Sequence, residues 1–243
     1  MERFAIEASM AKVYGSETSD MVVDNCMQIF GGYGFIEEYS IAMAYRDDRI
    51  NRIWEGTNEI NRAIISGYMM KKVLTEEISL RDLLKDLDSF LLSNNHKDNR
   101  DIFSTEKHAV EAAKRLAVLI FQEALCEFGQ DLKHEQQLSE AFADIFTHIF
   151  TSESVICRAQ QTMSSNGISN MSFNIAKIDV AESLLDVRSL SSKCLNRIFS
   201  EEVPNRIMGP VIKLHDIINL NTDTISLKRS LGEYMIEKKD YPF

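Results

Sequence analysis

The sequence predicts an all-α protein, and three observations lead to this fold class. Proline and glycine, which interrupt helix interiors, number only 3 and 10 among 243 residues. No alternating run of Val, Ile and Thr bounded by paired turn residues marks a strand. Apolar residues instead recur three or four positions apart through most of the chain, which is the spacing of one helix face. We therefore expect helices alone, packed into bundles.

The first 75 residues are expected to form one domain, a partial helical bundle. Its helices are predicted over residues 2–30, 40–52 and 57–72. Gly15 weakens the periodicity of the first helix, so the pattern allows a kink or a break there. Gly31 and Gly32 end that helix, as glycine commonly does just past a helix end. Thr57 or Asn58 can cap the third helix with a short polar side chain.

A second helical domain is expected over residues 76–243, after a boundary near residues 74–79. Amphipathic stripes predict helices over residues 80–91, 104–129, 134–166 and 174–199. The polar stretch 93–100 is expected to be an exposed loop. Because four amphipathic helices with short connections usually pack antiparallel, residues 79–199 are predicted to form a bundle. Residues 204–243 carry no pattern that predicts more than short elements.

Charge and composition exclude several functions. The formal net charge of −10 argues against a nucleic-acid partner, because a phosphate backbone requires a basic face. The cysteines are widely separated, show no CxxC spacing and are expected to be small buried hydrophobes: Cys26, Cys126, Cys157 and Cys194. The five histidines show no ligand spacing, so no metal site is expected. No apolar run is long enough to span a bilayer, and the N-terminus does not have the pattern of a signal peptide.

Two short segments carry candidate chemistry. Gly31, Gly32 and Gly34 permit a close backbone approach to a phosphate-bearing ligand or a neighbouring chain. Taken alone, they are better explained by a helix C-cap with a tight turn. Glu55 lies between a large apolar ring, Trp54, and a glycine. Partial desolvation there would make its carboxylate a better base near neutral pH. A solvated loop acid is the alternative.

Three linked motifs change this balance. They are the run Ala8-Ser9-Met10-Ala11-Lys12, the segment QIFGGYGF over residues 28–35, and RDDRI followed by WEGTNEINR, over residues 46–62. In order and spacing, residues 1–72 resemble the C-terminal helical domain of acyl-CoA dehydrogenases. Such a resemblance implies a flavin enzyme that removes an α-proton from an acyl thioester. The β-hydrogen then leaves as hydride to flavin N5 and a trans-2-enoyl-CoA forms, as in fatty acid β-oxidation.

The resemblance assigns roles to individual residues. Glu55 matches the catalytic base, whose backbone N–H in the family also donates to the thioester carbonyl, and Gly56 matches the glycine against which substrate lies. Positions matching the FAD site are Thr57, Asn58 and Glu59 of one subunit, with Gln28, Ile29, Phe30, Gly31 and Gly32 contacting the FAD of a neighbouring subunit. Arg46, Asp47 and Arg49 are interpreted as a structural cluster that fixes the second helix.

The same resemblance implies partners and a larger protein. We expect a homodimer or homotetramer with FAD, an acyl-CoA substrate and an electron-transfer flavoprotein as redox partner. An N-terminal helical domain and a β-domain normally precede this region, so the chain is expected to be a C-terminal fragment that is inactive alone. Residues 79–243 resemble the extension of the very-long-chain branch and favour a long-chain substrate. The expected location is the bacterial cytoplasm, or the mitochondrion in a eukaryote, with peripheral membrane contact as a further expectation.

The alternative is a helical interaction or oligomerisation module without catalysis. Such a module would retain the family's helices but would have no reason to retain its reactive residues. The intact Glu55-Gly56-Thr57 sequence argues against it, because a decayed site need not keep these residues.

Overall fold

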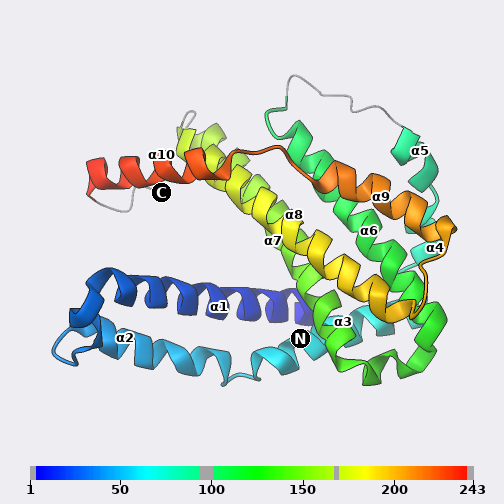
Figure 1. Cartoon of the computed structure of the whole chain (residues 1–243), viewed down its shortest axis with the longest axis horizontal. Helices are drawn as coiled ribbons and strands as arrows, with labels where there is room; N and C mark the ends of the chain where they lie inside the picture. Colours follow the sequence, from blue (N-terminus) through cyan, green and yellow to red (C-terminus); the bar gives the residue numbers. More distant parts are fainter. Residues whose placement is uncertain (1–3, 93–100, 167–169, 240–243) are drawn as a thin grey trace. The chain divides into compact units, whose positions relative to one another are not determined.

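The computed structural model describes residues 4–92, 101–166 and 170–239, and all regular structure in these ranges is helical (Figure 1). With η marking a 3-10 helix, the elements are α1 (Ala5–Phe30), η2 (Gly31–Phe35), α2 (Ser40–Asp48), η3 (Arg49–Arg52), α3 (Asn58–Leu74), α4 (Leu80–Leu84), α5 (Leu87–Leu92), α6 (Ser104–Phe128), η4 (Gly129–His134), α7 (Gln136–Asn166), α8 (Asn170–Ile198), α9 (Asn205–Ile218) and α10 (Thr224–Lys238). The all-α prediction is confirmed. None of these helices combines the length and the apolar character that crossing a bilayer requires.

The chain divides into two compact units. The first comprises Met1–Ile78 with Lys133–Ala143, and the second comprises Ser79–Leu132 with Asp144–Phe243. The change of unit near Ser79 lies close to the expected boundary. Residues 133–143, which the sequence analysis assigns to the second domain, group with the first unit.

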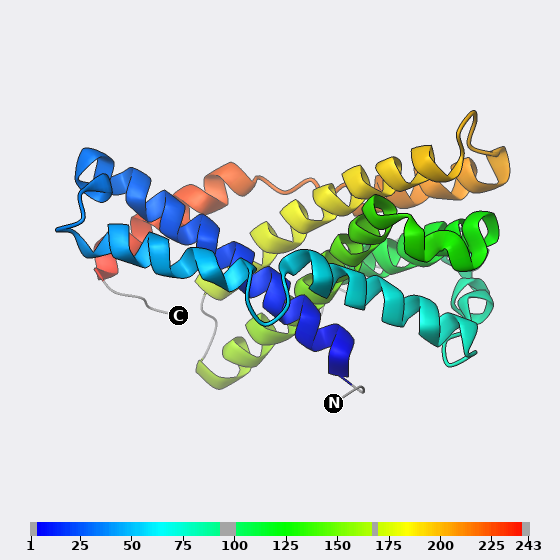
Figure 2. The same ribbon diagram turned by 90° about the horizontal axis from the view of Figure 1, so that it is seen from below.

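In the first unit, α2 and α3 both pack against α1. They follow each other along α1 in Figure 1, and Figure 2 shows α1 crossing them at an angle. Met10 and Val13 of α1 and Ile65 of α3 are buried in this unit. Helix α1 runs unbroken through Gly15, so the kink that the sequence allows does not form. A single glycine weakens a helix by only about 1 kcal/mol, which packing of α1 along α3 outweighs.

Local chemistry sets the helix ends of this unit. Thr57 is the N-cap of α3, and its hydroxyl accepts from the backbone N–H of Ile60 at 3.3 Å. Gly31 ends α1 with a left-handed φ of 57°. Gly34 is buried, and a Cβ there would lie 2.5 Å from the carbonyl oxygen of Met27, so only glycine fits. Gly31 and Gly34 therefore have a structural role whether or not they contact a ligand.

In the second unit, α6 packs against α8 and α9, and α10 packs against α8. Phe121 of α6 and Phe146 of α7 meet edge to face at 5.6 Å between ring centroids. The stripe at residues 80–91 forms two short helices, α4 and α5, rather than one. The tail, for which no extended helix was expected, forms α9 and α10. The loop prediction for residues 93–100 lies outside the described residues.

Candidate active site

Glu55 lies in a turn between η3 and α3 whose backbone is left-handed at two successive residues. The φ angles are 55° at Glu55 and 79° at Gly56. A residue other than glycine in this region costs about 1–3 kcal/mol and persists only where its surroundings determine it. The other described non-glycine residues with positive φ, Glu76 and Lys239, lie at the C-terminal ends of α3 and α10, where this conformation is common. Glu55, Gly56 and Thr57 are called the Glu55 turn below.

The side chain of Glu55 is exposed, and so is its neighbour Trp54, at 56%. The indole N–H of Trp54 donates to Oδ1 of Asn51 at 3.1 Å. The desolvation expected from this ring is therefore not provided by the described residues. In the described ranges, the backbone N–H of Glu55 donates no hydrogen bond. Glu55 is thus an exposed residue whose backbone N–H has no acceptor among the described residues.

The carbonyl groups of the Glu55 turn accept hydrogen bonds from two side chains of the first unit, those of Asn61 and Lys12. The side-chain amide nitrogen of Asn61 lies 2.8 Å from the carbonyl oxygen of Gly56, 3.1 Å from that of Thr57 and 3.5 Å from that of Glu55. Lys12 of α1 donates from Nζ to the Gly56 carbonyl at 2.8 Å. The Gly56 carbonyl therefore accepts from two side chains on different helices.

A polar network continues from Lys12 along α1. Nζ of Lys12 also donates to Oδ1 of Asn58 at 2.6 Å, and Nδ2 of Asn58 donates to Oγ of Ser16 and Oε1 of Glu17, each at 3.0 Å. Arg62 binds Glu17 through two nitrogens, at 2.7 and 2.9 Å. Burial alone would raise the pKa of Glu17, but hydrogen bonds from Arg62 and Asn58 and the Arg62 charge lower that pKa below its usual value.

The N-terminus of α3 already holds an anion. Glu59 is exposed, and its pKa lies below the usual value, first because its own backbone N–H donates to the carboxylate and then because the Thr57 hydroxyl does. Negative charge at a helix N-terminus is favourable, and here the chain supplies it. This end of α3 consequently has less capacity for a phosphate than a helix N-terminus without an acidic residue.

Asn58 faces the interior of the first unit. It is 2% exposed, and its amide is engaged by Lys12, Ser16 and Glu17. A cofactor contact by Asn58 stays a prediction, and in this arrangement it would have to come from a group other than the side-chain amide. Thr57 and Glu59 keep more exposed surface.

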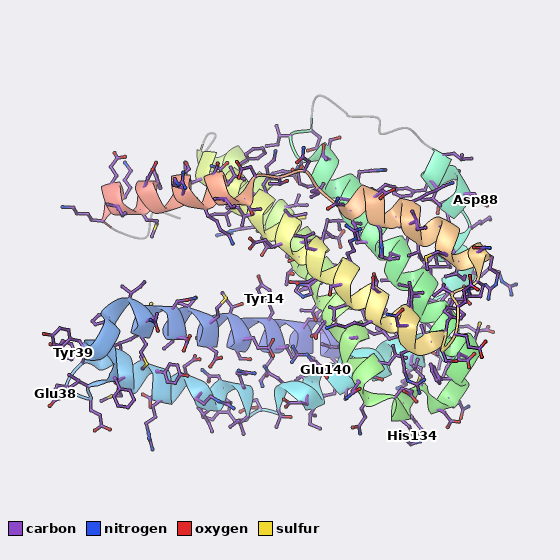
Figure 3. The ribbon with its side chains drawn as sticks, in the orientation of Figure 1. Tyr14, Glu38, Tyr39, Asp88, His134 and Glu140 are labelled. Atoms are coloured by element: carbon purple, nitrogen blue, oxygen red, sulfur yellow. The ribbon has the colours of Figure 1, made fainter. Side chains whose placement is uncertain are left out.

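The predicted cofactor segment at residues 28–32 is open. All five residues are exposed, and a Cβ added at Gly31 or Gly32 would meet no atom within 4 Å. After this segment, the rings of Tyr33 and Tyr39 lie 5.3 Å apart between their centroids. Tyr39 belongs to the turn between α1 and α2, where Figure 3 labels it beside Glu38.

The two predicted cofactor segments do not meet within this chain. Lys12 contacts the Glu55 turn, whereas Gly31 follows the far end of the same helix. At 1.5 Å per residue, roughly 28 Å of α1 separates Lys12 from Gly31. One chain therefore presents two separate contact regions.

The charged side chains that fix α2 and η3 are neighbours of those expected. Arg46, Asp47 and Arg49 are exposed. Asp48 is instead 9% exposed and accepts from Ser19 at 2.5 Å and Asn51 at 3.1 Å. Beside it, Arg52 pairs with Asp20 at 3.0 Å.

Sequence reasoning missed the residues that hold the turn, above all Lys12 and Asn61. The sequence contains only a weak indication of this network, namely the spacing of its polar residues. Lys12, Ser16 and Glu17 are spaced four and one apart on α1, and Asn58 and Arg62 four apart on α3, which places each set along one helix face. No group of three His, Cys, Asp or Glu side chains in the described part of the chain could hold a metal ion.

Two family models match the chain, and both are described as acyl-CoA dehydrogenase, C-terminal domain. One covers residues 1–70 and the other residues 112–211. A probable acyl-CoA dehydrogenase of Bacillus subtilis (strain 168) is 31% identical over 241 residues, which is 98% of this chain and 40% of that protein. The mitochondrial very long-chain specific acyl-CoA dehydrogenase of Bos taurus is 31% identical over 184 residues, 66% of this chain and 28% of that protein.

A solved structure is similar over the same extent. The crystal structure of an acyl-CoA dehydrogenase complexed with FAD from Bacillus anthracis matches with a TM-score of 0.87 and 29% identity, covering 98% of this chain and 40% of that one. The chain thus spans less than half the length of these relatives.

Proposed function

Because the chain belongs to the acyl-CoA dehydrogenase family, we propose that it supplies the catalytic base and part of the FAD and acyl-CoA sites of such an enzyme. The Glu55 turn carries this proposal. Its backbone is in an unfavourable conformation, while Glu55 is exposed and its backbone N–H has no acceptor among the described residues. A strained residue with a reactive side chain is typical of an active site.

Three features of the turn suit α-proton removal from a thioester. The Glu55 carboxylate receives the proton. The backbone N–H of Glu55 donates to the thioester carbonyl and stabilises the enolate-like charge that develops there. Gly56 has no side chain to keep the substrate away from the backbone. FAD, when bound, would supply the hydride acceptor for the β-hydrogen, and the product would be a trans-2-enoyl-CoA.

The residues at 28–32 fit a contact with FAD. They are exposed, and the space beside Gly31 and Gly32 is open to a flat or phosphate-bearing group. We assign contacts there to Gln28, the backbone of Gly31 and Gly32, and the apolar flank of Phe30. Thr57 and Glu59 would contribute from the other region.

The separation of these regions supports a shared cofactor site. With roughly 28 Å of helix between them, residues 28–32 of one chain and the Glu55 turn of another can face one cofactor more readily than both regions of the same chain. We therefore propose a homodimer or homotetramer in which neighbouring subunits complete each site.

A long acyl chain is the proposed substrate, and fatty acid β-oxidation the proposed process. Support comes from the match to a protein named as very long-chain specific, which extends well beyond residues 1–70. An electron-transfer flavoprotein as acceptor, and a bacterial cytoplasmic or mitochondrial location, follow from the family alone. The net charge of −10 makes contact with anionic lipids the weaker part of this proposal.

The test is Glu55→Gln in the natural polypeptide that carries this chain. The amide keeps the shape but removes the base, so flavin reduction by acyl-CoA should slow at least ~10²-fold while FAD content stays unchanged. Glu7→Gln, at an exposed position of α1, serves as the matched control. Flavin reduction at the wild-type rate in Glu55→Gln would exclude Glu55 as the base.

One observation favours a second role, the assembly of subunits. Large apolar side chains are exposed along the first unit, among them Ile29 at 83% and Phe35 at 85%. A non-catalytic oligomerisation module would use this surface without needing Glu55. Assembly that is unchanged in Glu55→Gln, with no activity in either protein, would favour that alternative.

A further inference from the structure

We propose that Lys12 and Asn61 form a two-sided clamp on the Glu55 turn and act as positioning residues for Glu55. Neither is expected to touch the substrate. Each acts through the backbone of the turn, Lys12 from α1 and Asn61 from α3. The proposal deepens the function above and rests on it for its catalytic consequence, whereas the clamp itself rests on geometry alone.

Asn61 holds the turn from within α3. Its amide nitrogen reaches three successive carbonyl oxygens, and the side chain is only 6% exposed. A Cβ at Gly56 would lie 3.2 Å from this nitrogen. Gly56 therefore packs directly on the Asn61 amide, which orients the successive peptide planes of the Glu55 turn.

Lys12 ties the same turn to a helix 44 positions earlier in the chain. Its ammonium group donates to the Gly56 carbonyl and to Asn58, the first residue of α3. A cation at a helix N-terminus interacts unfavourably with the helix dipole, so stabilisation of α3 does not explain this placement. Fixing the carbonyl of a strained turn does explain it.

The two contacts converge on one atom. The Gly56 carbonyl oxygen accepts from Lys12 and from Asn61, each at 2.8 Å, so both of its lone pairs are engaged from opposite helices. With that carbonyl fixed, the preceding peptide is fixed as well, and Glu55 keeps its left-handed conformation. Without the clamp, the turn should relax toward ordinary backbone angles, and the carboxylate and N–H of Glu55 should no longer be held in place.

The clamp can be tested in the 243-residue chain without any activity. Trp54 is the only tryptophan, so labelling Trp with carbonyl ¹³C and Glu with ¹⁵N leaves one NMR signal for the Trp54–Glu55 peptide. Gly56-Thr57 is the only Gly-Thr pair, which gives a second unique signal by the same approach. The variants are Lys12→Met, which removes the donor, Lys12→Arg, which keeps one, and Asn61→Asp, which replaces the donor by an acceptor. Lys72→Met, in the last turn of α3, is the control.

The expected result is local. The amide of Glu55 should be rigid in the wild type and in Lys72→Met, with an order parameter near ~0.85, and flexible in Lys12→Met and Asn61→Asp, below about 0.6. The Gly56 carbonyl signal should shift in both of these variants, and Lys12→Arg should recover much of the rigidity. A Glu55 amide that stays rigid in Lys12→Met overturns the proposal. If Lys12→Met gives no cooperative thermal melt, Lys12→Gln replaces it and the same outcomes apply.

Activity then separates this inference from the proposed function. In the natural enzyme, Lys12→Met should lower kcat about 10²-fold and change KM little, as expected when a reacting group is misplaced while binding is retained. Lys12→Arg should recover part of the rate. Lost rigidity with unchanged kcat would keep the clamp but remove its catalytic consequence. If Glu55→Gln is fully active, the base assignment fails while the NMR result still decides the clamp.

Discussion

At the scale of single residues, Glu55 has a left-handed backbone conformation that its residue type does not favour. Glycine is the residue that a left-handed turn favours, and Gly56 meets this requirement at a φ of 79°. Glu55 has a similar conformation with a full side chain. The polar contacts of Lys12 and Asn61 compensate for this strain. A residue retained against its backbone preference is better explained by its chemistry than by stability.

This view predicts that Glu55→Gly stabilises the 243-residue chain. Relief of the left-handed strain, less the greater entropy of glycine in the unfolded chain, leaves a gain of about 0.5–1 kcal/mol. Urea unfolding followed by circular dichroism measures it. Glu55→Gln keeps the strain and should leave the midpoint unchanged. A lower midpoint for Glu55→Gly would contradict the assignment of strain to this residue.

At the scale of elements, one ion pair connects the middle of α1 to the first turns of α3. Arg62 and Glu17 are joined through two nitrogens, and the Arg62 side chain is 12% exposed. Asn58 links the same carboxylate to Lys12. Helix α1 and helix α3, whose start adjoins the Glu55 turn, are therefore held together by hydrogen-bonded charges as well as by Met10, Val13 and Ile65.

The lowered pKa of Glu17 predicts how acid affects this pair. Because the pKa is lower in the folded chain than in the unfolded one, the contribution of Glu17 to stability is present above the unfolded value of about 4.3 and is lost as pH falls through the folded value. Urea midpoints should therefore fall between about pH 5 and pH 3. Glu17→Gln should flatten this fall, whereas Asp24→Asn, at an exposed position of α1, should not. An equal pH dependence in all three proteins would show that the pair does not contribute.

At the scale of the whole molecule, many large apolar side chains of the first unit are exposed, as expected of a surface that contacts a partner. The N-terminal half of α1 buries Ile6, Met10 and Val13, and most exposed apolar side chains of this unit lie further along the chain. They continue from the second half of α1 through η2 and α2 to the Glu55 turn: Met21, Val22, Ile29, Phe30, Tyr33, Phe35, Ile36, Met43, Ile50, Ile53 and Trp54. The chain spans 40% of two of its relatives.

We expect the 243-residue chain to self-associate through this surface and to bind FAD weakly on its own. Analytical ultracentrifugation should show a concentration-dependent mass, and the purified protein should be colourless. Phe35→Ser should weaken association at least ~10-fold, because covering a large apolar side chain contributes about 1.5–3 kcal/mol. Ile225→Ser, at an exposed position of α10, is the control. A strictly monomeric or a yellow preparation would be evidence against this expectation.

The sequence by itself determined the fold class, most helix positions and the family. Helical periodicity, the few prolines and glycines, and the glycines after α1 are local signals, and a local signal can be read without knowing what packs where. Motif spacing likewise singled out Glu55. The same local signals also allowed a break in the first helix at Gly15 and partial desolvation of Glu55 by the ring of Trp54. The structure has neither, because helix continuity and exposure depend on distant partners.

Only the tertiary structure decided how the Glu55 turn is held. Lys12 and Asn61 lie 44 and 5 positions from Gly56, and no sequence period connects a lysine on one helix to a carbonyl before another. Burial of Asn58, which the motif assigned to the cofactor site, follows from the same packing of α1 on α3. The physical reason is that every residue has the same backbone carbonyl, so the sequence does not mark which carbonyl a side chain will bind. The partners of these carbonyls are set by the three-dimensional path of the chain, which places one polar face of α1 against the start of α3.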